Sequence, residues 1–287
     1  MPFLSYAPDD VRSKFGSMPF RIRHTLAGHP LTSLESLAEL AESVPANLVE
    51  HNLGRVPDVA VGGEVPTADM PLGEMVRTIE TNGCWMVLPI ETSPRYRELY
   101  DALFDEIRPH LPDREGEIVK RHAVFFLASG GSTTPTHIDA EQGFLLHIKG
   151  RKELRIGPFE NPVAGQQEAE RQAAGGHRNV DHLPRTAQTF RMEPGDGVHI
   201  PAFMPHVVHT DADGYALSLA FASRTEATLR HTAVHGLNGR LRRLGVKPTP
   251  PGRRLRQDRL KERAFDAAKQ VVRRAPSRGN LGVRDLS

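Results

Sequence analysis

The chain has 287 residues, enough for one large domain or one domain with appendages, and its 38% hydrophobic and 25% charged content is ordinary for a globular protein. Its single cysteine, Cys84, excludes an intramolecular disulfide and a multi-cysteine metal site. No stretch approaches the roughly 20 apolar residues of a membrane span, and the first residues lack the apolar core of a signal peptide. We therefore expect a soluble, cytoplasmic protein.

The charge is unevenly distributed along the chain. The net charge is only +2, but residues 240–278 contain 14 Lys and Arg against three acids, a local charge of +11 that leaves −9 for the remainder. Such asymmetry indicates either a polyanionic partner or a solvated surface that faces an acidic body.

Helices and loops dominate the pattern of residues 1–119, which we expect to pack on the domain that follows. The elements predicted here are a helix from the 32–35 capping box to Pro45, an extended loop at 52–71, a helix at 72–81 ended by Asn82 and Gly83, a buried strand at 84–90, and a helix from Ser93 to Pro109.

Short strands separated by turn residues follow in residues 120–224. They lie at 122–129, 143–149, 152–157, 187–192, 198–201, 206–209 and 215–222. This spacing is typical of a β-sandwich or barrel. Residues 158–186, rich in Gly, Gln, Glu and Ala, interrupt the series as a long insertion, which at a barrel mouth would be a lid or a substrate loop.

Helical periodicity returns in residues 225–275. One helix is marked by apolar residues at 229–241, and a basic helix follows at about 254–274. The tail at 276–287 has no periodic pattern, and we expect it to be disordered.

Two His-x-Asp triplets occur in the chain, at 137–139 and 209–211, and about one is expected by chance among 14 histidines. Asp211 runs into a Gly-containing turn, where an aspartate has an ordinary turn role. The triplet at His137 and Asp139 follows a strand and a Gly-Gly-Ser-Thr-Thr-Pro loop, and its spacing matches the strand period, so both side chains project to one side.

A third ligand candidate, His206, lies 69 residues after His137, just beyond a predicted type II turn at 193–196. Two imidazoles and one carboxylate form the facial triad of non-haem Fe(II) oxygenases. The sequence therefore predicts an iron site at His137, Asp139 and His206.

These residues and their neighbours resemble the cupin-like JmjC family of Fe(II)- and 2-oxoglutarate-dependent dioxygenases. The resemblance runs from about 121 to 222 and is carried by Thr-Pro-x-His-x-Asp at 134–139, Gly-x-Lys at 150–152 and Pro-Gly-Asp-x-x-x-Ile-Pro-x-x-x-x-His at 194–206. Within the family, the pattern is most similar to the asparaginyl hydroxylase called factor-inhibiting hypoxia-inducible factor. The resemblance implies a double-stranded β-helix, the jelly-roll barrel of cupins.

The resemblance also implies a set of co-substrate residues. Thr134 and Lys152 correspond to the family's 2-oxoglutarate contacts, and Ser218, or Ala220, stands where a further contact is expected. Lys152 offers a cation for the distal carboxylate and Thr134 a hydroxyl donor. Lys149 competes with Lys152, but it ends its strand, where a solvated lysine is expected.

The predicted activity is hydroxylation of an unactivated C–H bond, on a protein side chain or a small metabolite, with Fe(II), 2-oxoglutarate and O₂. An N-methyl demethylase would use the same site, and a cupin-like regulator would bind metal without turnover. For the basic C-terminal helices we expect a homodimer interface first and nucleic acid second, since their apolar positions predict a buried face and aromatic residues for base stacking are nearly absent.

Overall fold

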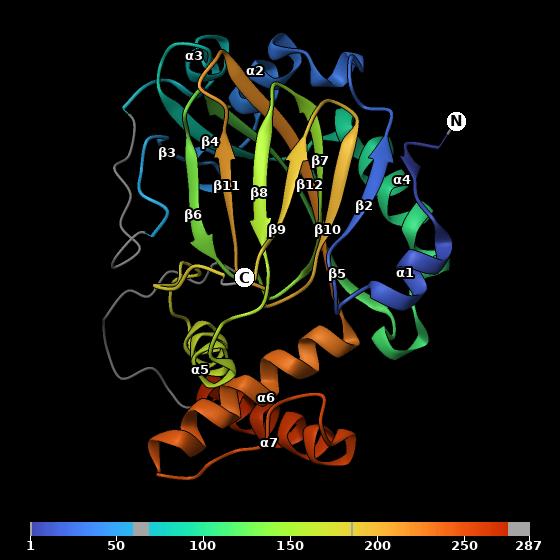
Figure 1. Ribbon diagram of the computed structural model, residues 1–287, viewed down its shortest axis with the longest axis vertical. Coiled ribbons are helices and arrows are strands. Elements are labelled where there is room, and N and C mark those ends of the chain that lie inside the picture. Colours follow the sequence, from blue (N-terminus) through green and yellow to red (C-terminus); the bar gives the residue numbers. More distant parts are fainter. Residues whose placement is uncertain (1, 60–68, 185, 275–287) are drawn as a thin grey trace.

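The computed structural model describes residues 2–59, 69–184 and 186–274, and these form a barrel of two facing antiparallel sheets with helices outside it (Figure 1). The strands are β1 Leu4–Ser5, β2 Phe20–His24, β3 Glu50–Leu53, β4 Cys84–Pro89, β5 Ile118–Ser129, β6 Thr133–His137, β7 Gln142–Lys149, β8 Lys152–Ile156, β9 Gln188–Met192, β10 Asp196–Ile200, β11 His206–Thr210 and β12 Tyr215–Thr225. One sheet has the order β1-β2-β10-β7-β12-β5-β4-β3, and the other β6-β11-β8-β9. The predicted jelly-roll fold is confirmed.

Strand alternation divides the apolar side chains between two cores. On β7, Phe144 and Leu146 face the helices outside the larger sheet, whereas Leu145 points between the two sheets. The inner core also takes side chains from both sheets, namely Leu154, Ile156, Phe190, Met192, Val198, Ile200 and Val208. The inner core fills one part of the barrel and leaves the remainder of its interior for a cavity.

The first 119 residues contribute more strand than their sequence predicts. Four of the strands in the larger sheet, β1 to β4, come from this region. β2 was not predicted. It buries Phe20 and Ile22 on alternate positions, and it pairs with β10 from Phe20 to Arg23, so a distant partner stabilises a strand whose own pattern is only five residues long.

Four helices cover the outer face of the larger sheet. They are α1 Pro8–Lys14, α2 Leu34–Ser43, α3 Leu72–Arg77 and α4 Arg97–Ile107. The N-cap of α2 is Ser33, whose hydroxyl accepts a hydrogen bond from the Ser36 amide, instead of the predicted box beginning at Thr32. α3 ends at Arg77, earlier than predicted, and a turn continues to Gly83, which has a positive φ of 69°.

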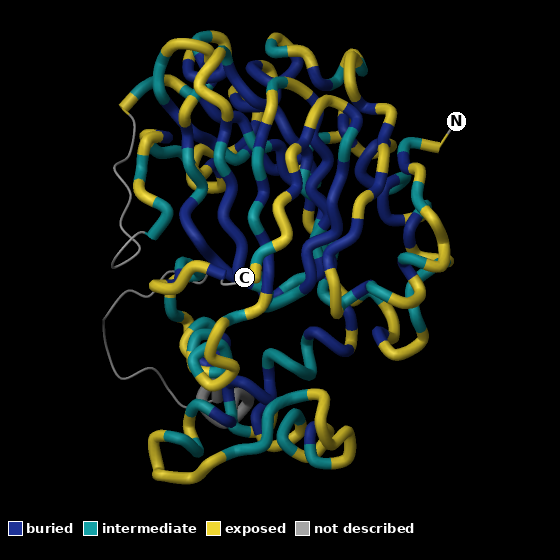
Figure 2. The backbone as a smooth tube through the Cα atoms, in the orientation of Figure 1, coloured by how far each residue is buried: buried dark blue, intermediate teal, exposed yellow. Residues whose placement is uncertain are grey.

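Three further helices form a layer at one end of the barrel (Figure 1). They are α5 Pro162–Ala173, within the insertion, and the C-terminal pair α6 Glu226–Arg243 and α7 Leu255–Arg274. Glu170 of α5 accepts two hydrogen bonds from Arg242 of α6, at 2.8 and 3.0 Å. Figure 2 shows that the outer surface of this layer is largely exposed. The predicted disordered tail and part of the 52–71 loop lie outside the described residues.

A membrane span is not found among the helices that the structure describes, since none is both long and apolar enough.

Candidate metal centre

Two strand ends meet at the end of the barrel that faces α5 and α6. β6 ends at His137 and β11 begins at His206, and these two residues are direct partners in the antiparallel pairing. Asp139 follows two residues after His137. The pairing therefore brings together three side chains that are separated by up to 69 positions in the sequence.

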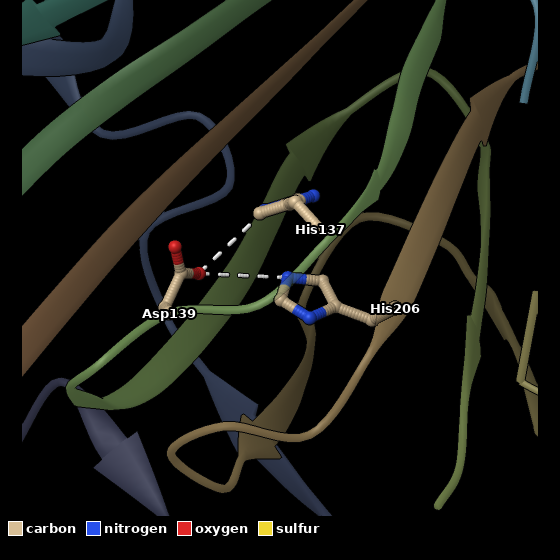
Figure 3. Close-up of side chains that lie close together, drawn as sticks. All are labelled: His137, Asp139 and His206. Atoms are coloured by element: carbon tan, nitrogen blue, oxygen red, sulfur yellow. Dashed lines mark ion pairs between the residues drawn. The ribbon is translucent and has the colours of Figure 1, made fainter. Parts of the chain in front are cut away.

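The three side chains converge on one point, as Figure 3 shows. The Nε2 atoms of His137 and His206 each lie 3.6 Å from Oδ2 of Asp139. The Nδ1 atoms lie 2.8 Å and 3.0 Å from the carbonyl oxygens of Pro135 and Met204, to which they donate. In the neutral form of each ring, the nitrogen that faces the centre therefore carries the free lone pair, which is the tautomer that metal-binding histidines adopt. This is the one metal-ligand cluster of three or more residues in the described part of the chain.

The pKa values of Asp139 and His206 suit a metal ion. Burial alone would raise the pKa of the Asp139 carboxyl, but its attraction to His137 and Arg178 holds that pKa well below the ordinary value. Burial lowers the pKa of His206 to about 3, so its imidazole is neutral at physiological pH. A carboxylate with neutral imidazoles is the form that binds a cation, and this mixed set fits Fe(II).

Arg178, in the insertion after α5, is a site residue that sequence analysis missed. Its Nη1 lies 3.6 Å from Oδ1 of Asp139, the carboxylate oxygen opposite the one that faces the histidines. The backbone around it is fastened to the ligand strand, since the Ile138 amide donates to the Arg178 carbonyl and the Val180 amide donates to the Thr136 carbonyl. The insertion therefore forms one wall of the metal centre.

A cavity of about 190 Å³ extends from the triad into the barrel. Thr134 and Lys152, both predicted to bind the co-substrate, line it. The Lys152 side chain is buried, and within the described residues it has no hydrogen bond or ion pair; burial lowers its pKa to about 8. An uncompensated buried cation is costly, so the position favours an anionic ligand.

Ser218, the further co-substrate contact expected from the sequence, is not among the residues that line this cavity. Its hydroxyl is fully buried and lies 3.1 Å from Nδ1 of His147, whose Nε2 lies 2.9 Å from the Gly150 carbonyl. Ala220, the alternative on the same strand, lines the cavity instead.

The residues that competed with the predicted ligands have other partners. Nε2 of His209 lies 2.7 Å from Oδ1 of Asp58, and Oδ2 of Asp211 lies 2.9 Å from Nε of Arg151. Lys149 is exposed, with its Nζ 4.7 Å from the centre of the Tyr215 ring. The second His-x-Asp triplet therefore contacts Asp58 and Arg151 and does not converge on one point.

The fold and the triad define a cupin-type barrel with a metal centre at its mouth. Comparison with protein families then specifies the type: the sequence profile of the JmjC domain matches residues 103–229, so the chain carries a JmjC domain. With the His-Asp-His cluster, such a domain is of the Fe(II)- and 2-oxoglutarate-binding type that the sequence predicts.

Solved structures agree with this fold. The X-ray structure of E. coli ycfD is similar over 99% of this chain and 76% of that chain, with 18% identity and a TM-score of 0.53. A crystal structure of the Escherichia coli ribosomal oxygenase YcfD is similar over 96% and 70%, with 18% identity and a TM-score of 0.50. No curated protein matches the sequence. The closer likeness to the asparaginyl hydroxylase stays a prediction.

Proposed function

We propose that this chain is an Fe(II)- and 2-oxoglutarate-dependent oxygenase that hydroxylates a C–H bond in a protein side chain. His137, Asp139 and His206 hold the metal, and Lys152 pairs with the distal carboxylate of 2-oxoglutarate. The observation that carries the proposal is the buried cation of Lys152, which has no side-chain hydrogen bond or ion pair among the described residues and shares a cavity with a facial triad.

The positions of the two groups suit a dicarboxylic acid that bridges them. The backbone of Lys152 on β8 pairs with that of Thr210 on β11, and Thr210 lies four residues after His206. The backbone positions of Lys152 and His206 are therefore about 13 Å apart along the strand, and both side chains extend into the cavity between them. The keto acid end of 2-oxoglutarate chelates a metal, and its other carboxylate would meet the ammonium, with Thr134 as a further hydrogen-bond donor. When iron, 2-oxoglutarate and O₂ are bound, the centre supplies the oxidant for C–H hydroxylation and releases succinate and CO₂.

A protein substrate is favoured over a metabolite by a second cavity next to the first. This cavity of about 420 Å³ lies between β3 and β6 and shares Glu50, Thr134 and Arg178 with the metal cavity. Leu53, on its rim, is 43% exposed. The combined space would accept a side chain at the metal and flanking backbone beside it. The fold neighbour named a ribosomal oxygenase supports the same substrate class, and we propose a ribosomal protein as the substrate.

Succinate formation tests the proposed chemistry. The purified chain with Fe(II), 2-oxoglutarate and O₂ should release succinate slowly without substrate and faster with a protein that it hydroxylates, and a chelator should stop both. A protein that binds Fe(II) tightly but forms no succinate from 2-oxoglutarate would be a metal-binding regulator. Release of formaldehyde from an N-methylated peptide would instead identify a demethylase.

The KM for 2-oxoglutarate should depend on pH through Lys152. Burial lowers the pKa of Lys152 to about 8, and only the ammonium form attracts the distal carboxylate. The attraction is therefore nearly complete at about pH 7 and is lost as the pH rises through 8, so KM should approach an increase of about tenfold per pH unit well above 8.

Steady-state kinetics between pH 6.5 and 9.5 checks this dependence. Lys152→Arg keeps its charge throughout that range, so its KM should not rise between pH 8 and 9.5. A wild-type KM that stays constant across the range would contradict the role of Lys152.

A further inference from the structure

Five arginines cluster at the beginning of α7 and in the turn before it. These are Arg253, Arg254, Arg256, Arg259 and Arg263, here called the arginine face, and all five are exposed. Within the described residues none of them takes part in a side-chain hydrogen bond or an ion pair.

The acids nearby do not neutralise this cluster. Asp258 is buried and accepts a hydrogen bond from the Gly252 amide at 2.8 Å, and Glu262 pairs with Arg230 of α6 at 3.2 Å. Asp266, beyond the cluster, is the exposed acid of this stretch. The arginine face therefore keeps most of its positive charge.

The opposite side of α7 holds the helix on the protein. The buried ring of Phe265 packs against Gly236 of α6. Nζ of Lys261 donates a hydrogen bond to Oδ1 of Asn238, also on α6, at 2.8 Å. Asp258, Lys261 and Phe265 follow helical spacing on one side, whereas Arg256, Arg259 and Arg263 repeat the same spacing on the other. The packing of α7 therefore turns the arginines toward solvent.

Folding of α7 does not explain the arginines. The N-terminal end of a helix carries a partial positive charge, so cations in its first turn are unfavourable by some tenths of a kcal/mol each. Arg256 lies in that first turn, and Arg253 and Arg254 directly precede it. The charge is better explained by a ligand than by helix stability.

We propose that the arginine face binds the phosphate backbone of RNA. A guanidinium group donates two parallel hydrogen bonds to a phosphate, and several of them along a helix suit a chain of phosphates. The one aromatic residue of α7, Phe265, is buried, so contacts would be to the backbone and independent of sequence. The choice of RNA over DNA rests on the proposed function, since a ribosomal substrate lies among RNA.

A second copy of this chain is a weaker occupant of the same surface. In a two-fold symmetric contact the same patch meets itself, which would place five arginines against five. The homodimer expected from the sequence stays a prediction; exposed Leu244 and Val246, at the end of α6, offer it a different surface.

The test compares two triple variants of the full-length, iron-loaded protein. Arg256→Gln, Arg259→Gln and Arg263→Gln remove charge from the arginine face. Arg12→Gln, Arg108→Gln and Arg191→Gln remove the same charge elsewhere, from exposed ion pairs that contribute little to stability. Fluorescence anisotropy with a labelled 20-nucleotide single-stranded RNA and the matching DNA measures binding, and thermal melting confirms that both variants fold.

The wild type and the control variant should bind the RNA, more weakly as salt is raised. The slope of the logarithm of the binding constant against the logarithm of the salt concentration should fall by about two units in the arginine-face variant, because each lost phosphate contact removes about 0.7. At 100 mM salt this variant should bind roughly 100-fold more weakly than the wild type. Succinate formation should be unchanged. Wild-type binding to DNA alone, an equal loss in both variants, or no RNA binding at 50 mM salt would overturn the proposal.

Two further outcomes would identify another occupant. Dissociation of a dimer by the arginine-face variant in sedimentation analysis would assign the surface to a second copy. Binding to anionic vesicles without binding to RNA would assign it to a membrane. If RNA binding is found but no succinate forms, the arginine face stands and the proposed oxygenase function fails.

Discussion

Asp139→Ala and His206→Ala should each abolish succinate formation and weaken Fe(II) binding by more than about 100-fold. A change in a residue that only supports a metal ligand lowers the affinity by up to about 100-fold, and loss of a ligand itself should cost more. Each change removes one of three donor atoms that lie within 4.8 Å of one another. The thermal midpoint should remain close to that of the wild type, because both side chains point into the metal centre and β6 and β11 remain paired around them. Isothermal titration with Fe(II) under argon measures the affinity.

His209→Ala is the matched control for these variants. It removes the histidine of the second His-x-Asp triplet, which lies on the same strand as His206 but contacts Asp58. We expect unchanged iron binding and unchanged turnover. Loss of iron in His209→Ala together with its retention in His206→Ala would show that the ligand set is wrong.

Lys152→Ala should raise the KM for 2-oxoglutarate by about two orders of magnitude, since a buried lysine–carboxylate pair typically contributes a few kcal/mol. Fe(II) affinity should hardly change. Without 2-oxoglutarate the variant should be at least as stable as the wild type, because the substitution removes a buried cation that has no ion-pair partner in the described part of the chain. Steady-state kinetics and thermal melting with and without 2-oxoglutarate measure both effects.

Lys149→Ala is the control, since this lysine is exposed beside Tyr215 and does not line the cavity. Its KM should equal that of the wild type. An unchanged KM in Lys152→Ala would leave Arg178, the one arginine in the described lining, as the group that holds the carboxylate.

The metal centre was predictable because its signals are local. A strand-period spacing joins His137 to Asp139, and a Pro-Gly turn marks the beginning of β10, the strand directly before the one that His206 begins. Gly150, with a positive φ of 77°, makes the tight turn that begins the strand of Lys152. Each of these features needs only a few neighbouring residues to be recognised.

The elements that sequence analysis missed depend on distant contacts. α5 buries only Ala169 and Glu170 along its length, so its sequence has no strong apolar stripe, and Arg242 of α6 provides much of its anchoring. Arg178 reaches Asp139 across an insertion whose path no local pattern predicts.

Ser218 shows what strand alternation leaves open. The alternate residues Leu217 and Leu219 pack in the outer core, so Ser218 faces the interior of the barrel together with Ala220, as alternation predicts. Further along the strand from the cavity, Ser218 pairs with His147 and contacts its ring, while Ala220 lines the cavity. The pattern of a strand gives the face of each side chain, but not which part of the barrel interior the cavity occupies.

The most direct test of the central claim is an anaerobic titration of the Fe(II)-loaded protein with 2-oxoglutarate, followed by visible absorption. Chelation of the keto acid by iron on the triad should produce a charge-transfer band that saturates at one equivalent. The band should be absent in Asp139→Ala and should need about 100-fold more 2-oxoglutarate in Lys152→Ala. A wild-type protein that binds Fe(II) but shows no spectral change up to a large excess of 2-oxoglutarate would contradict the account.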